Sequence, residues 1–131
     1  TANFTGKAKA IQRYTGQFSQ SEKAKSARLG ALDIPAILVF TMDTAPLKEA
    51  PDTRISLFFV TYTDYADKAS SEHDGWIICE NYAKWLQDNH IFADDTTNYI
   101  IGDLSQQRAN VLLNDYRHTI IELPIIVTAD R

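Results

Sequence analysis

The alternation of apolar and polar residues breaks down in the segment Thr53–Tyr65, TRISLFFVTYTDY, where both sets of alternate positions become apolar. In an extended chain these two sets lie on opposite faces. They are Ile55, Leu57 and Phe59 on one face, and Phe58, Val60 and Tyr62 on the other. A strand with one face exposed to solvent alternates apolar and polar residues along its whole length. This segment does not, so it predicts a strand that is covered on both faces.

Four further segments have the composition of strands. The clearest is 33–43, DIPAILVFTMD, an apolar run with β-branched residues that is also apolar on both faces. The others are 7–14, which the Thr15–Gly16 turn ends, 99–104, YIIGDL, and 116–128, YRHTIIELPIIVT. Pro124 cannot donate a ladder hydrogen bond, so we expect the last strand to lie at a sheet edge or to bulge there.

Two segments have helical patterns. Residues 74–89 repeat apolar side chains at i, i+4, i+7 and i+8, with Asp74 as the expected N-cap. These side chains are Ile78, Tyr82, Trp85 and Leu86. A second, short and basic helix is expected from Ser19 or Ser21 to Gly30.

These elements predict one domain over residues 1–131, of α/β (α+β) class. Its expected architecture is a single, mostly antiparallel sheet of four to five strands with one long and one short helix packed on it. The long helix can cover only one face of the sheet. The other face therefore needs the short helix, an N-terminal element or another subunit.

Composition agrees with a globular domain, since 44% of the 131 residues are hydrophobic and 23% are charged. No segment is long and apolar enough to cross a membrane, and the start has no signal-peptide core. The first residue is Thr, so we expect the chain to be processed or trimmed. The single cysteine, Cys79, excludes an internal disulfide framework.

Charge divides the chain into two parts. Residues 1–30 hold six basic residues and one acidic residue, a net charge of +5. Residues 31–131 hold seven basic and sixteen acidic residues, a net charge of −9. The six basic residues are Lys7, Lys9, Arg13, Lys23, Lys25 and Arg28. The acidic whole argues against nucleic-acid binding, and we expect the basic residues to contact an acidic neighbouring subunit.

Candidate chemistry is sparse. Cys79 lies near His73 and Asp74, but its apolar neighbours indicate a buried, inert thiol rather than a nucleophile. The three histidines lie in separate segments without the spacing of a zinc site. We therefore expect no catalytic residues, no metal, no cofactor and no enzymatic activity.

The order of these segments resembles the tail-terminator family of Mu-like phages with contractile tails. The resemblance lies in the YTG turn (Tyr14–Gly16), IPAILVF (Ile34–Phe40), a proline-bearing loop, ISLFFVTYTD (Ile55–Asp64), a long helix and a terminal hairpin. Members usually begin with a further helix before the first strand. No catalytic residues come with the resemblance.

The resemblance implies a structural virion protein, assembled in the host cytoplasm and located in the virion tail. Its subunits would form a homo-oligomeric ring, expected to be a hexamer, that caps the tail tube and sheath, contacts neck or connector proteins and stops polymerisation. We expect Arg54, Phe58, Val60 and Tyr62, with the six basic residues, to form the subunit interface. The alternatives are a small α/β enzyme or ligand-binding domain, and a nucleic-acid-binding adaptor that uses the basic first thirty residues.

Overall fold

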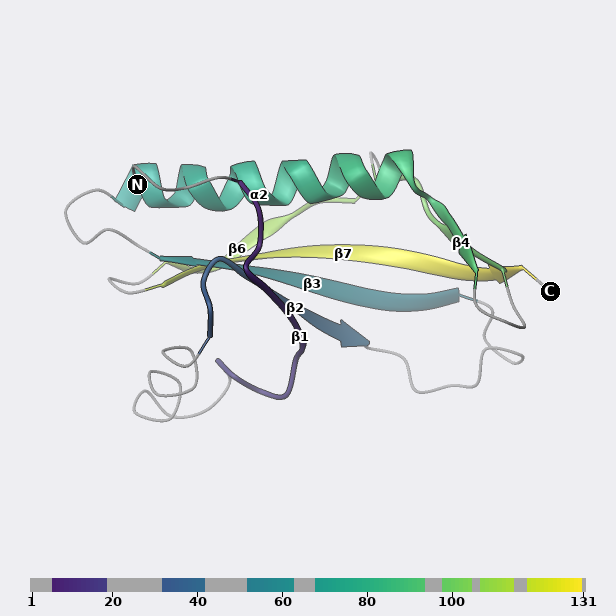
Figure 1. The fold of residues 1–131 in the computed structure, drawn as a ribbon, viewed down its shortest axis with the longest axis horizontal. Coiled ribbons are helices and arrows are strands. Elements are labelled where there is room, and N and C mark those ends of the chain that lie inside the picture. Colours follow the sequence, from purple (N-terminus) through teal and green to yellow (C-terminus); the bar gives the residue numbers. More distant parts are fainter. Residues whose placement is uncertain are drawn as a thin grey trace.

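The fold was analysed in a computed structural model that describes residues 6–18, 32–41, 52–62, 68–93, 98–104, 107–114 and 118–130. Within these ranges the chain forms seven strands and one helix (Figure 1). The strands make one sheet in the order β1-β2-β3-β7-β5-β4, and β6 pairs with β7 beside this path. The short helix expected from Ser19 or Ser21 to Gly30 lies outside the described residues.

The expected fold class is wrong. The protein is mostly β, with seven strands in a curled, mixed sheet that resembles half of a barrel, and the described residues contain a single helix. The expectation of four to five strands missed β4 (Ile91–Ala93) and β6 (Asn110–Asn114), which the sequence pattern indicated as connections. Each is a short edge strand, and its extended conformation depends on pairing with a distant partner.

The centre of the sheet is an antiparallel pair of long strands, β3 (Asp52–Tyr62) and β7 (His118–Asp130), which run side by side in Figure 1. On the other side of β3 lies β2 (Ala36–Thr41), also antiparallel. The edge strand β1 (Ala10–Arg13) pairs with β2 in parallel, which makes the sheet mixed. At the opposite edge, β5 (Asn98–Ile101) joins the end of β7 to β4.

Pro124 does not place its strand at an edge, contrary to expectation. β7 pairs with β3 in unbroken register through Ser56↔Pro124. On its other side, β6 covers Thr119–Glu122 and β5 covers Val127–Asp130, so Pro124 lies between the two. On that side the carbonyl oxygen of Ile126 accepts a hydrogen bond from the backbone N–H of Gly102. Residues two apart in a strand point their backbone groups to the same side. The backbone nitrogen of Pro124 therefore points to the gap between β6 and β5. The sheet loses no inter-strand hydrogen bond there, although this nitrogen carries no hydrogen.

The helix α2 spans Lys68–Asp88 and lies along one face of the sheet (Figure 1). It begins six residues before the expected start, so Asp74 is inside the helix rather than at its N-cap. Gly75, one residue further on, has a packing role. A Cβ on Gly75 would lie 2.9 Å from Cδ1 of Ile121, so the glycine lets the helix approach β7 closely.

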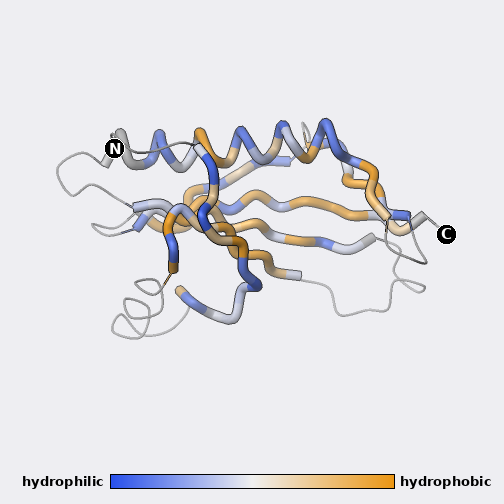
Figure 2. Tube along the Cα trace, in the orientation of Figure 1, coloured by the Kyte–Doolittle hydropathy of each residue, from blue (hydrophilic) through white to orange (hydrophobic). Residues whose placement is uncertain are grey.

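The strands that are apolar on both faces have a buried core on each face of the sheet. Toward the helix, Phe59, Leu57 and Ile78 belong to one buried cluster together with side chains of β2, β5 and β7. On the other face, Phe58, Val60 and Leu38 form a second cluster. Leu32 and Ile34 are buried in this second cluster, and Tyr14 and Phe18 pack against it. Figure 2 shows the apolar residues concentrated along the central strands, while the helix alternates between polar and apolar positions. The chain thus covers both faces of β3 by itself.

Candidate functional site

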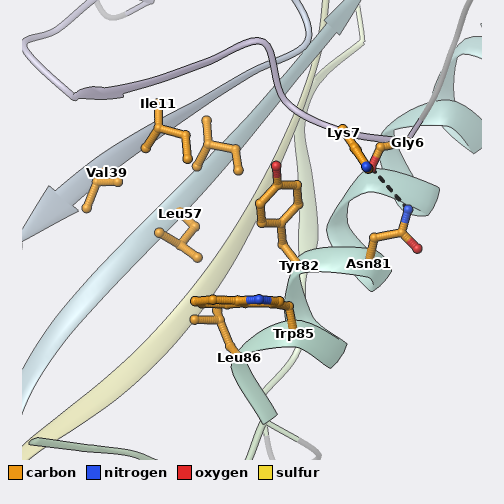
Figure 3. A pocket seen from close by; sticks show the side chains of 10 residues that line it. Gly6, Lys7, Ile11, Val39, Leu57, Asn81, Tyr82, Trp85 and Leu86 are labelled. Atoms are coloured by element: carbon orange, nitrogen blue, oxygen red, sulfur yellow. Dashed lines mark hydrogen bonds between the residues drawn. The ribbon is translucent and has the colours of Figure 1, made fainter. Parts of the chain in front are cut away.

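An apolar pocket of about 570 Å³ lies between the second half of α2 and the strands β1 to β3 (Figure 3). Figure 3 shows the strand and helix side chains facing one another across it. The lining residues are Gly6, Lys7, Ile11, Ile37, Val39, Leu57, Asn81, Tyr82, Trp85 and Leu86. Its volume lies within the range of about 300–1,000 Å³ that is usual for ligand pockets.

The strand wall of the pocket follows from the register of three strands. Parallel pairing sets Ile11 beside Ile37 and Arg13 beside Val39. In the next pair Val39 lies opposite Leu57. Because neighbouring residues in register point to the same face, the apolar members of this set make a continuous surface toward the helix side.

The helix wall leaves this surface partly open. α2 packs mainly over β3 and β7, near the middle of the sheet. Tyr82 and Leu86 pack against the core cluster under the helix, whereas 58% of Trp85 remains exposed. Across the pocket Ile11 is 64% exposed. The pocket is therefore an apolar slot whose outer rim carries a tryptophan and an isoleucine in contact with water.

One end of the pocket is closed by the segment that leads into β1. The Nδ2 of Asn81 donates to the carbonyl oxygen of Gly6 at 3.1 Å, and the backbone N–H of Ala8 donates to the Tyr82 hydroxyl at the same distance. Gly6 has φ of +75° and lies so close to Asn81 that a Cβ would meet Nδ2 at 2.6 Å. These two bonds fix the segment on the helix and hold Lys7 at the pocket.

The chemistry of the pocket is that of binding. Lys7 is the one charged residue among the ten that line it. No group of three or more His, Cys, Asp or Glu that could hold a metal ion occurs in the described part of the chain. Cys79 is buried in the core under the helix, where desolvation and then the neighbouring Glu80 raise its pKa to about 11. A thiol with this pKa is protonated at neutral pH.

A second exposed apolar surface lies at the opposite edge of the sheet, on β4. All three residues of β4 are exposed, with Ile91 at 63% and Phe92 at 46%. The ring of Phe92 stacks on that of Tyr99 in β5, with centroids 5.1 Å apart. Phe92 therefore has a defined position although it faces solvent. We call the exposed pair Ile91 and Phe92 the β4 edge.

The structure brings some of the predicted interface residues to the surface and buries others. Phe58 and Val60 lie in the second core cluster, covered by the chain itself, so they do not belong to an exposed surface. Arg54 and Tyr62 are exposed, and the Tyr62 ring stacks against His118 at 6.1 Å. Lys7, Lys9 and Arg13 are exposed on β1 and the segment before it. Lys23, Lys25 and Arg28 lie outside the described residues.

Sequence reasoning missed most of the pocket. Ile11 and Trp85 come from distant segments, and Trp85 was expected to pack on the sheet with Ile78. One signal was present, because Ile11 is an isolated large apolar residue in the otherwise polar stretch GKAKAIQR. The described residues contain no helix that is long and apolar enough for a membrane span. No protein-family model and no curated protein sequence matches the chain.

Proposed function

We propose that this protein is a structural subunit that assembles with copies of itself into a closed ring. In line with the resemblance to tail terminators, the ring would cap the tube and sheath of a contractile phage tail and stop their polymerisation. Neck or connector proteins would bind its other surface. The observation that carries the proposal is the presence of exposed apolar side chains at both ends of the sheet path.

A ring needs two different, complementary surfaces on each subunit, because its contacts are head-to-tail. The strand order sets β1 at one end of the path and β4 at the other. The large exposed side chains Ile11 on β1 and Phe92 on β4 are unusual for edges that face water in the final assembly. With one such edge at each end of the strand order, every subunit can make the same contact with the next one. A series of these contacts that closes is a ring.

Electron microscopy of negatively stained protein tests this proposal. The expected images are closed rings of uniform diameter with a central opening, in preparations of the purified chain alone. Open filaments of indefinite length, or particles of monomer size at every concentration, would contradict it.

The pocket favours a second candidate function, the binding of a small apolar molecule. Its volume and lining suit such a ligand, and Lys7 could pair with an acidic group on it. Titration with the anionic apolar dye anilinonaphthalene sulfonate would test this function. Saturable binding at one site, lost on substitution of the exposed pocket residue Ile11→Gln, is the expected result for a ligand-binding domain.

A further inference from the structure

We infer that the apolar pocket is the acceptor half of the ring contact and that its occupant is the β4 edge of a second copy of this chain. The inference rests on the proposed function, which supplies the second copy. It assigns the two surfaces that meet, and it names Phe92 as the side chain that enters the pocket.

The acceptor surface has the features of an unfilled interface. Trp85 and Ile11 face each other across the pocket opening and are each more than half exposed. Behind them Val39, Leu57 and Leu86 provide an apolar floor. Tryptophan is among the residues that contribute most to binding at protein interfaces. An apolar group placed between Trp85 and Ile11 would remove both from water.

The donor surface has a matching shape and chemistry. β4 is an edge strand of three exposed residues. The side chains of Ile91 and Phe92 point to opposite faces of the sheet, and both are open to solvent. Phe92 is an aromatic anchor, and its stacking on Tyr99 limits its motion before binding. A side chain that is already fixed in position loses less conformational entropy on docking.

Charge selects this pairing over the alternatives. Residues 6–13 hold Lys7, Lys9 and Arg13 and no acidic residue. Residues 89–104, which follow α2 and include β4, hold three acidic residues and no lysine or arginine; the three are Asp94, Asp95 and Asp103. The two edges therefore attract each other and fix the orientation of the contact.

The same charges disfavour symmetric contacts. Two β1 edges in contact would bring basic segments together, and two β4 edges would bring acidic segments together. The third edge with exposed apolar residues, on β6, offers no such complement. Residues 105–117 around Val111 and Leu112 hold two arginines and one aspartate, a net charge of +1. The basic β1 edge of the pocket therefore gains no electrostatic attraction from the β6 edge.

Three variants with neutral polar replacements test the inference without altering the charge split. Ile11→Gln removes one side of the pocket opening, and Phe92→Gln removes the anchor. Leu112→Gln is the matched control, because Leu112 is an edge residue that is 47% exposed on β6. Cooperative melting curves, recorded at a dilution at which the wild type is also monomeric, would show that each variant folds. At a concentration at which the wild type forms rings, we expect both site variants to be monomeric by light scattering, and the control to assemble.

A mixture of the two monomeric variants gives the decisive result. Ile11→Gln keeps an intact β4 edge, and Phe92→Gln keeps an intact pocket. Equimolar mixing should therefore give a one-to-one dimer of twice 14.8 kDa, about 30 kDa, that grows no further. Each subunit in that dimer would have its other surface disabled.

The remaining outcomes separate the inference from the proposed function. If the wild type and both site variants form rings, or if the mixture stays monomeric, the ring stands and the assignment of surfaces is wrong. If the wild type is monomeric at every concentration, the ring itself is wrong and the inference falls with it. A monomeric wild type that binds anilinonaphthalene sulfonate, with binding lost in Ile11→Gln, would assign the pocket to a small ligand and overturn both.

Discussion

At the scale of single residues, the most informative position is Thr61, whose hydroxyl is buried beneath α2. Thr61 Oγ1 is buried and has no hydrogen-bond partner among the described residues, and it lies 3.4 Å from where a Cβ on Gly75 would be. A buried hydroxyl without a partner costs about 1–3 kcal/mol of stability. We therefore expect Thr61→Val, which keeps the side-chain volume, to raise the free energy of unfolding by about 1 kcal/mol, measured by urea denaturation.

The control for this prediction is Thr119, which lies opposite Thr61 in the β3–β7 register. Thr119 is fully buried but has an interaction partner. Thr119→Val should therefore lower the stability. If Thr61→Val is as destabilising as Thr119→Val, the Thr61 hydroxyl has a partner and the account of this contact is wrong.

The pKa of Cys79 leads to a prediction about alkaline pH. Burial and Glu80 raise this pKa from 9.0 to about 11. A group whose pKa is higher in the folded state contributes stability that is fully present below pH 9 and is lost as the pH rises through 11. Between pH 9 and 11 the wild type should lose more unfolding free energy than Cys79→Ala, in which this proton is absent. Urea titrations of both proteins at pH 8 and pH 11 measure the difference, and parallel losses would contradict it.

At the scale of elements, β3 is a strand between two cores, and this changes the expected effect of its aromatic residues. Phe59 is fully buried under the helix, and Phe58 is buried among the rings of Tyr14 and Phe18, at 5.1 and 5.0 Å. Truncating either should cost about 3–5 kcal/mol of unfolding free energy. Thermal melting of Phe58→Ala and Phe59→Ala checks this, with Tyr62→Ala as the exposed control. If the Phe58→Ala subunit is as stable as the control, Phe58 is not part of a buried core.

The elements that the sequence pattern predicted correctly are those whose signal is local. β2 lies within its predicted segment, and β3 and β7 overlap most of theirs, because their apolar runs exceed the length of a turn. The placement of Phe59 and Phe58 on opposite faces of β3 also followed from alternation alone, and the two residues lie in separate core clusters. β4 and β6 could not be predicted in this way, since three and five residues pair with partners that only the tertiary fold brings near. The pocket was hidden for the same reason, because hydrogen bonds of Gly6 and Ala8 to α2 join segments far apart in sequence.

At the scale of the whole molecule, the separation of charge makes assembly depend on salt. Exposed charges further apart than about 8 Å are screened at physiological ionic strength, and more strongly as salt is added. We expect the concentration needed for half-assembly to rise when sodium chloride is increased, as measured by sedimentation velocity. Lys9→Gln should reduce this dependence, since Lys9 is exposed beside β1 without lining the pocket. Assembly that strengthens with salt would show that apolar burial dominates and that the charges do not steer the contact.

Whether the chain forms a closed ring can be measured by its solution mass from light scattering across a range of protein concentrations. We expect the mass to rise from 14.8 kDa and then to stay constant at one multiple of it, which for six copies is about 89 kDa. A plateau is the signature of closure, because an open head-to-tail chain would continue to grow. A mass of 14.8 kDa at every concentration, or growth without a plateau, would contradict the account.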